Sequence, residues 1–349
     1  MIEIPRSLNI FLRRYIALSA LIITLFILIP LASSIGLLKV TFLDIYRVLL
    51  GYGLPEEEFI ALWIRLRRVL VGAIVGALLG GAGAVAQAVF RNPLASPFTL
   101  GISQASALGV AIALIAGYGG TATQWFIQFA RPYVLPLASF TLAILQTVLI
   151  LILAYRAGLS PQALVLSSIA LSFLYQAVLA VLQYLVLNEL QIATIVFWLF
   201  GDLGKAGNAE LLILSIGFIP IATAYMLMNL DLDLIAIGDE VSYASGLNPK
   251  RFRFTAVTLA ALGTSLATCF VGVLAFLCLL APHIARAVVG SPHRYLLPAS
   301  MTIGSILLIA SDTLGRVALY PRTLPAGIVL SFLGAPLLIS MLLRGSRRW

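Results

Sequence analysis

Long apolar runs, interrupted by charged residues, proline or glycine, constrain the fold of this chain more than any other feature. Hydrophobic residues make up 61% of its 349 residues and charged residues only 10%, whereas soluble domains carry about a quarter charged residues. An apolar run of roughly 20 residues can cross a bilayer as a helix. The sequence therefore predicts an all-α integral membrane protein and excludes a water-soluble fold.

Ten segments of this kind predict about ten transmembrane helices in a single membrane domain over residues 1–349. Transmembrane β-strands would alternate apolar and polar residues, and these runs do not alternate. The run from Phe254 to Val289 is too long for one crossing and is divided in two, which leaves a short eighth segment. The segments are Tyr15–Leu38, Leu66–Val89, Pro97–Ile115, Tyr133–Leu153, Ala163–Leu187, Leu211–Met228, Phe254–Leu274, Ala275–Val289, Leu296–Gly315 and Pro325–Leu343.

The distribution of Lys and Arg predicts that both termini lie in the cytoplasm. With ten crossings and the N-terminus inside, thirteen of the 22 basic residues fall on the cytoplasmic side and nine outside. They lie in short clusters between apolar runs, which indicates topology signals and not a nucleic-acid surface. Three outer residues, Arg65, Arg67 and Arg68, form a cluster where the second segment begins. This cluster breaks the positive-inside rule and needs a separate explanation.

The second segment has one face without side chains. Gly72, Gly76 and Gly80 follow each other at a spacing of four, and Gly83 comes next. Another helix can approach such a face closely. Small residues at this spacing are common in polytopic proteins, and we interpret the face as an intramolecular helix contact.

The polar residues exclude several classes of function. Of thirteen acidic residues, only Asp312 falls within a predicted span, near its outer end, whereas ion-coupled transporters usually keep an acid near the midplane. His283 and His293 are ten residues apart, and no HExxH, GxSxG or phosphate-loop motif occurs. For His283 we expect a structural hydrogen bond. These observations predict a transport protein that is not an enzyme, has no metal site or cofactor, and depends on another chain to bind nucleotide.

The longest predicted cytoplasmic connection runs from Asn229 to Arg253, between the sixth and seventh spans. Small and apolar residues recur in it near helical spacing, and Gly246 is suited to end a helix. The pattern predicts a short amphipathic helix over Ile237–Leu247. The acids at its start disfavour a helix that rests on lipid, because membrane-surface helices prefer basic residues. We interpret it as a coupling helix that docks into a cytoplasmic ATPase.

Five motifs follow one another between Arg65 and Arg344. They read RLRRVLVGAIVGALLGGAGAVAQAVFRNPLASPFTLGIS, GLSPQALVLSSIALS, GDEVSYASGLNPKRFR, LLAPHIARAVVGSPHRYLLPAS and LPAGIVLSFLGAPLLISMLLR. In composition and order they resemble the FecCD-type permeases of ABC importers for iron-siderophores, haem and cobalamin.

The resemblance implies the membrane-spanning subunit of an ATP-driven importer that takes up such a metal chelate by alternating access. It implies a homodimer with the translocation path along its axis, two ATPase subunits that bind ATP and magnesium, and an extracytoplasmic substrate-binding protein. The chain would be a multi-pass protein of the cell (inner) membrane, surrounded by lipid. An ion-coupled secondary transporter and a non-transporting scaffold or receptor are the alternatives.

The resemblance also assigns an outer docking site. Arg65, Arg68 and Arg316 match arginines that grip acidic residues of the binding protein. Alternatively, these side chains reach lipid headgroups. The chain departs from the family in two places, because Arg67 replaces a usual proline, and Ala275 and Cys278 replace a glycine pair. Helix packing around the eighth segment is therefore expected to differ.

Two further sets of residues are implied at the cytoplasmic face. The gate would consist of one loop with Asn92 and Leu94 and another with Ser160, Pro161 and Gln162, although ordinary turn formation would also explain these residues. Apart from these two sets, some polar residues could line the path or contact other helices, namely Gln124, Gln128, Gln176 and Gln183. ATPase coupling is implied for Gly238, Asp239, Glu240, Ala244, Ser245, Gly246 and Leu247.

Overall fold

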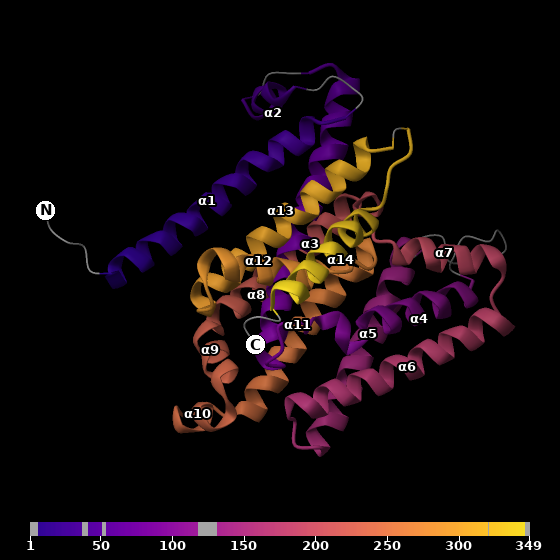
Figure 1. The fold of residues 1–349 in the computed structure, drawn as a ribbon. Coiled ribbons are helices and arrows are strands. Elements are labelled where there is room, and N and C mark those ends of the chain that lie inside the picture. The colour runs from indigo at the N-terminus through magenta and orange to yellow at the C-terminus, as the bar shows by residue number, and fades with distance from the viewer. Residues whose placement is uncertain (1–5, 37–40, 51–53, 118–130, 320, 346–349) are drawn as a thin grey trace, which may run out of the picture.

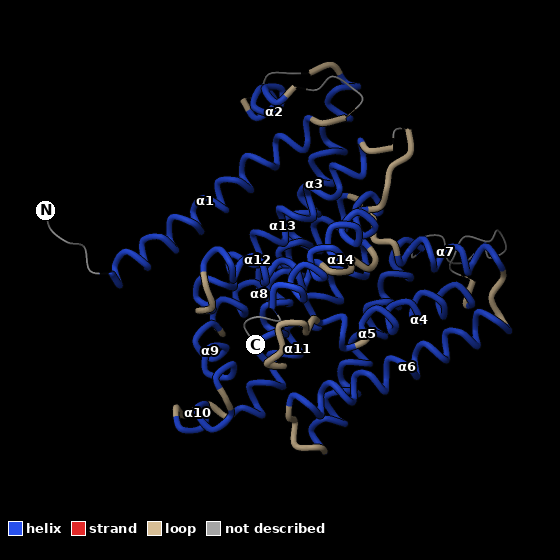
Figure 2. Tube along the Cα trace, in the orientation of Figure 1, coloured by secondary structure: helices blue, strands red, loops and turns tan. Residues whose placement is uncertain are grey.

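The computed structural model describes residues 6–36, 41–50, 54–117, 131–319 and 321–345. Within these ranges the chain forms helices and connections, with one isolated bridge between Leu319 and Arg322 and no strand (Figures 1 and 2). The all-α prediction is confirmed. In chain order the elements are α1 (Arg6–Ser34), α2 (Phe42–Leu49), α3 (Glu56–Val89), η1 (Pro97–Leu100), α4 (Ile102–Ile115), α5 (Arg131–Arg156), α6 (Pro161–Leu185), α7 (Glu189–Leu199), η2 (Leu203–Lys205), α8 (Asn208–Leu227), α9 (Asn229–Ile237), α10 (Asp239–Ala244), α11 (Pro249–Val271), α12 (Leu277–Val289), α13 (His293–Val317) and α14 (Ala326–Gly345).

Each of the ten predicted segments coincides with a helix. Seven of the described helices are long and apolar enough to cross a membrane, namely α1, α3, α5, α6, α8, α11 and α13. The shorter apolar helices α4, α12 and α14 correspond to the other three predictions. The division of the long run is confirmed, because α11 ends at Val271 and α12 begins at Leu277.

Two short helices, α2 and α7, lie outside the predicted spans. At α2, the Asp44 carboxylate accepts hydrogen bonds from the backbone N–H and the hydroxyl of Thr41, at 2.7 and 2.6 Å. At α7, Asn188 and Gln191 form a reciprocal pair, with side chain to backbone distances of 2.9 and 3.0 Å. These capping interactions explain where both helices begin, and their sequence pattern is a signal that the hydropathy analysis did not use.

The antiparallel pair α3 and α13 forms the centre of the bundle (Figure 1). A Cβ atom added at Gly76 would lie 2.4 Å from the Gly304 carbonyl oxygen, and one at Gly80 would lie 2.2 Å from that of Ser300. One at Gly83 would lie 1.8 Å from the Cys278 oxygen. The predicted intramolecular contact is therefore confirmed, and Gly83 supplies the close approach at the position where Cys278 departs from the family pattern.

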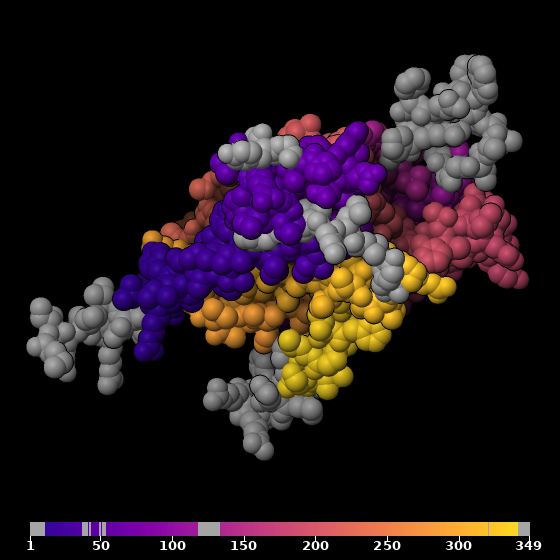
Figure 3. All heavy atoms as spheres, turned by 90° about the horizontal axis from the view of Figure 1, so that it is seen from above, coloured from indigo at the N-terminus to yellow at the C-terminus, as the bar shows by residue number. Residues whose placement is uncertain are grey.

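The remaining helices surround this pair. Of the most apolar stretch of α3, 83% is buried, compared with 11% for that of α1. Figure 3 shows α1, in indigo, extending to one side and the α6–α7 region, in rose, to the other. Helix α2 lies at one end of the bundle and α10 at the opposite end (Figure 1), and we call these the α2 end and the α10 end.

Gly76→Ala should lower the free energy of unfolding by at least about 1–3 kcal/mol, because the new methyl group meets backbone that cannot move aside locally. Gly72→Ala is the matched control, since its Cβ would meet only the side-chain ends of Leu203 and Ile309, at 3.0 and 3.4 Å. Thermal unfolding of the purified proteins in detergent measures the difference. Equal midpoints for the two variants would contradict the close α3–α13 contact.

Candidate functional site

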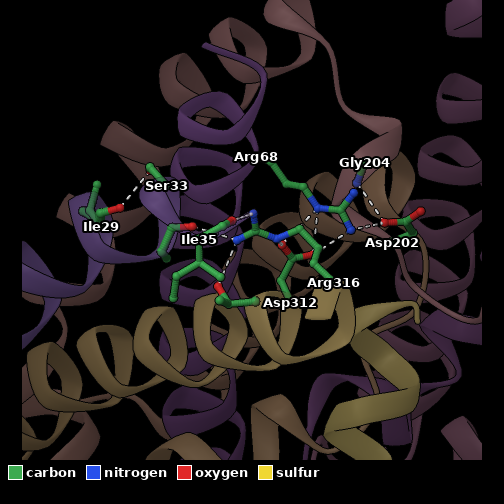
Figure 4. A network of polar contacts seen from close by, with 10 residues as sticks. Ile29, Ser33, Ile35, Arg68, Asp202, Gly204, Asp312 and Arg316 are labelled. Carbon is green, nitrogen blue, oxygen red and sulfur yellow. Dashed lines mark hydrogen bonds and ion pairs between the residues drawn. The ribbon is translucent and has the colours of Figure 1, made fainter. Parts of the chain in front are cut away.

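At the α2 end, Arg68 of α3 is held between two carboxylates (Figure 4). Its Nε lies 2.9 Å from both carboxylate oxygens of Asp312 in α13, and its Nη2 lies 2.8 Å from Asp202 Oδ1. The Asp202 carboxylate also accepts the backbone N–H of Gly204 at 2.9 Å. The Asp312 side chain is only 2% exposed. Arg68 therefore joins α3, α13 and the connection before η2 by charge-assisted hydrogen bonds.

Arg316 extends this network to α1. Its Nε lies 3.3 Å from Asp312 Oδ2, one helical turn back along α13. Its two terminal nitrogens donate to the carbonyl oxygens of Ile35 and Ala32, at 3.1 and 2.9 Å. The guanidinium thus satisfies carbonyl groups that the end of α1 leaves without helical partners. Asp312, which the sequence singled out as an acid within a span, neutralises both arginines.

All three arginines predicted to dock a partner line one cavity at this end. The cavity has a volume of about 660 Å³ and is bounded by Arg65, Arg68 and Arg316 together with apolar side chains of α3 and of the segment after α13. Arg65 Nη1 lies 3.4 Å from the Ser34 oxygen. Arg67, which replaces the family's proline, instead lies 3.3 Å from the Asn208 side chain at the start of α8. The cavity places three guanidinium groups where an anionic side chain could enter.

Lys205, in η2, lies near the same network. Its Nζ lies 3.3 Å from the Phe197 carbonyl oxygen near the end of α7. Burial lowers the pKa of Lys205, and the charge of Asp202 partly offsets this effect.

The loop after α3, near the α10 end, contains Asn92 and Leu94. The Asn92 Oδ1 accepts the Leu94 N–H at 2.9 Å, which forms a local turn, and the Leu94 side chain is exposed. A cavity of about 340 Å³ lies between this loop, η1, α4 and α6. It is lined by polar and apolar residues and by no charged one among the described residues: Asn92, Leu94, Ala95, Phe98, Thr99, Gln104, Val165, Ile169, Ser172, Phe173 and Gln176.

The second predicted gate loop forms the start of α6. Ser160 is its N-cap, with Oγ accepting the Ala163 N–H at 3.1 Å, and Pro161 occupies the first turn. Gln162 is exposed. Turn and capping chemistry thus accounts for the local conformation of both loops, and the gate assignment stays a prediction. Of the polar path candidates, Gln176 lines the cavity described above, while Gln124 and Gln128 lie outside the described residues.

The predicted coupling segment is helical, but its boundaries differ from those expected. The helix predicted over Ile237–Leu247 is α10, which is shorter and runs from Asp239 to Ala244. A second helix that was not predicted, α9, precedes it and ends at Ile237, with Gly238 between the two. Gly246 ends the segment in the left-handed region (φ +84°), and the following Leu247 N–H bonds the Ser242 oxygen. The prediction of a stop at this glycine is confirmed.

Asp239 connects α10 to its surroundings. Its carboxylate accepts hydrogen bonds from Arg253 of α11, one of them at 2.7 Å, and pairs with Arg91 in the loop after α3. Arg253 Nη1 also lies 3.5 Å from the Leu159 oxygen, in the loop before α6. Residues of α10 that the sequence assigned to coupling, including Glu240, Ala244 and Ser245, are exposed. Arg91 and Arg253 were not predicted as functional residues.

Asp233 of α9 holds the start of α13. Its Oδ1 accepts the backbone N–H of His293 at 3.0 Å and lies 2.6 Å from His293 Nδ1. The carboxylate thereby caps the N-terminus of α13 from another helix. The prediction that His283 makes a structural hydrogen bond is wrong, because its Nδ1 is buried without a partner in the described part of the chain. The histidine that makes structural hydrogen bonds is His293.

No three His, Cys, Asp or Glu side chains in the described ranges come together as metal ligands.

Comparison with known proteins gives one consistent result. Residues 21–344 match the sequence profile of the FecCD transport family. The chain is 36% identical over 335 residues, 95% of each chain, to the Fe(3+)-citrate import system permease protein YfmE of Bacillus subtilis. It is 31% identical over 336 residues to the hemin transport system permease protein HmuU of Yersinia pestis, covering 94% of this chain and 95% of that one.

A solved structure shares the fold. A metal-chelate type ABC transporter in an inward-facing conformation superposes with a TM-score of 0.81 and 25% identity. The match covers 94% of this chain and 98% of the other.

Asp312→Asn should lower the free energy of unfolding by about 3 kcal/mol, because Arg68 and Arg316 would stay buried without the carboxylate that they share. Glu57→Gln, which removes an exposed acid at the start of α3, is the control. Thermal unfolding in detergent gives the comparison. Equal stability of both variants would show that the network does not stabilise the fold.

Proposed function

The chain belongs to the FecCD transport family, and we propose that, as the membrane-spanning permease subunit of an ABC importer, it forms half of a dimeric channel for a ferric chelate or haem. The relatives named above are permeases for ferric citrate and hemin. Cobalamin, which the sequence analysis also allowed, stays a prediction. Two ATPase subunits supply the energy, and a substrate-binding protein delivers the cargo.

The exposed face of α10 is the observation that carries the proposal. Ser242 is fully buried and faces the body of the protein, whereas Val241 and Tyr243 of α10 are 41% and 55% exposed. Ile237, at the adjoining end of α9, is 68% exposed. Large apolar side chains that are exposed next to one another at a protein surface indicate a contact with a partner. Because the sequence contains no phosphate-binding loop of its own, we assign this face, with the coupling residues from Gly238 to Leu247, to the ATPase.

This assignment fixes the orientation that we propose. The α10 end is the cytoplasmic end and the α2 end is the outer one. The seven long helices and the three shorter ones α4, α12 and α14 then account for ten crossings. An even number of crossings brings both termini to the same side, and the Lys and Arg distribution predicts that this side is the cytoplasm.

The outer cavity supports docking of the binding protein. Arg65, Arg68 and Arg316 converge on it, and a carboxylate of a partner would find three guanidinium groups there. Arg68 and Arg316 also hold the fold together through Asp312, so a change at either affects stability as well as docking. Arg65 is therefore the position at which docking can be tested most directly.

The uncharged cavity beside Asn92, Leu94 and Gln176 supports the proposed translocation path and gate. It lies against α6, the helix that the family places along the pore, and beside the loop with Asn92 and Leu94, one of the two loops assigned to the gate. A path without charges suits a bulky chelate, because it offers steric closure and weak hydrogen bonds and no strong binding site. Homodimerisation would place a second copy of this surface across the axis.

The secondary-transporter alternative finds no support in the arrangement of acids. Asp312, the acid singled out within a span, lies at the α2 end between Arg68 and Arg316. A coupling-ion site needs a carboxylate near the midplane that can exchange its ion. Asp312 is instead engaged in structural ion pairs.

In proteoliposomes that contain the ATPase and binding protein encoded with this chain, uptake of ferric citrate or haem should require ATP and resist a protonophore. An ATPase variant unable to hydrolyse ATP is the control and should abolish uptake. Uptake that a protonophore abolishes and the inactive ATPase leaves intact would establish the secondary transporter. Copurification of all partners without any ATP-driven uptake would indicate a scaffold.

Arg65→Glu should weaken binding of the substrate-binding protein by about tenfold at low salt, because it reverses one charge on the rim of the docking cavity. Arg47→Glu makes the same change of charge on α2, where the side chain is 61% exposed, and controls for general electrostatics. Surface plasmon resonance on nanodisc-embedded importer measures the affinity. An unchanged affinity for Arg65→Glu, or an equal loss in both variants, would remove Arg65 from the docking site.

A further inference from the structure

Three separate elements meet at one carboxylate at the α10 end. Asp239, the first residue of α10, is paired with Arg253 of α11 and with Arg91 of the loop after α3. Arg253 uses its two terminal nitrogens on the two oxygens of this carboxylate, and one of them also lies near the Leu159 oxygen. The contacts reach both loops that the sequence assigned to the gate.

We propose that Asp239 and Arg253 form an ion-pair relay that transmits movement of α10 to both loops at the mouth of the path, through Arg91 to one loop and through the Leu159 carbonyl to the other. The inference rests on the proposed function, since it takes α10 as the helix that the ATPase moves. It adds the connection by which that movement reaches the path.

The geometry of Arg253 favours transmission over a loose surface contact. The Arg253 side chain is 1% exposed, and its two terminal nitrogens bind the two oxygens of the Asp239 carboxylate. Two parallel bonds fix the orientation of the guanidinium group relative to the carboxylate as well as the distance between them. The other outward residues of α10 are exposed, and the helix packs mainly against its chain neighbours α9 and α11. A displacement of α10 therefore acts on Arg253 and Arg91 directly.

The loops that the relay reaches share a backbone feature. Arg91 and Leu159 are two of the three described non-glycine residues in the left-handed region, with φ of +46° and +55°. Arg91 follows the end of α3 at a position where glycine is the usual residue, and Leu159 follows Gly158, the left-handed glycine after α5. A side chain makes this conformation less favourable, and it persists only when surrounding contacts hold it. In both cases a contact with the Asp239–Arg253 pair can stabilise this conformation, since Arg91 pairs with Asp239 and the Leu159 oxygen lies near Arg253.

The charges of Asp239, Arg91 and Arg253 indicate how the loop after α3 should move when α10 moves. One carboxylate serves two guanidinium groups, and burial together with the neighbouring Arg253 charge lowers the pKa of Arg91. If α10 withdraws Asp239, the two arginines face each other without a counter-ion. Their repulsion would then separate the loop after α3 from α11.

The test uses the complete importer in lipid nanodiscs, with and without ATP, and two measurements. The first is cargo transported per ATP hydrolysed. The second is hydrogen–deuterium exchange, by mass spectrometry, of peptides covering residues 90–96 and 157–162. The Ala95 amide is hydrogen-bonded to the Asn92 oxygen within its loop, and the Leu159 amide to the Ala154 oxygen in the last turn of α5, so both report whether each loop changes. In the wild-type importer, ATP should alter exchange in both peptides.

Asp239→Asn should abolish the ATP-dependent exchange change in both loops and lower transport per ATP by at least about tenfold. Arg91→Gln should abolish the change in residues 90–96 only, and Arg253→Gln mainly that in residues 157–162. Because Arg253 is buried and its variant can misfold, the partly exposed Arg91 is the decisive position. Arg156→Gln, an exposed arginine beside the second loop, is the matched control and should behave like the wild type.

The relay is overturned if Arg91→Gln keeps the ATP response of residues 90–96, or if wild-type loops show no response while transport proceeds. Normal behaviour of Asp239→Asn contradicts the relay alone. Failure of the wild-type importer to transport with ATP contradicts the proposed function itself.

Discussion

The close contact between α3 and α13 is the constraint on which the rest of the structure depends. Inside a membrane, burial of apolar surface gives helices little reason to associate, because lipid is as apolar as a leucine side chain. Association then depends on packing, and packing depends on how closely two backbones can approach. Gly76 and Gly80 of α3 place backbone directly against Gly304 and Ser300 of α13. The two helices therefore pack together as the central unit of the bundle.

Polar interactions are concentrated at the two ends of this unit. At the α2 end, Asp312 of α13 joins Arg68 of α3 and Arg316, which also holds the end of α1. At the α10 end, Asp233 of α9 caps the start of α13. If the predicted coupling segment moves, α13 connects it as one continuous helix to the surface proposed for docking of a binding protein. This gives a physical route between the two faces that an importer must coordinate.

The sequence predicted much of the fold but fewer of the functional contacts. All ten apolar segments coincide with helices, and the glycine face on α3 was assigned correctly, because both signals are local and repeat along the chain. The short helices α2 and α7 were missed because they lack the length that hydropathy detects, although their capping residues were visible. Three arginines assigned through family resemblance do converge on one cavity, while two of them prove to be structural as well.

The sequence by itself determined the class of protein, the positions of its apolar helices and the breaks between them, because hydrophobicity, glycine spacing and capping act over a few residues. Only the tertiary structure decided the partners of the charged groups. Arg68 meets Asp312 across 244 residues, and Asp202 across 134. Arg91 and Arg253 share Asp239 because three elements fold to one point. Such pairings depend on the distances and angles between packed helices, which no local pattern in the chain records.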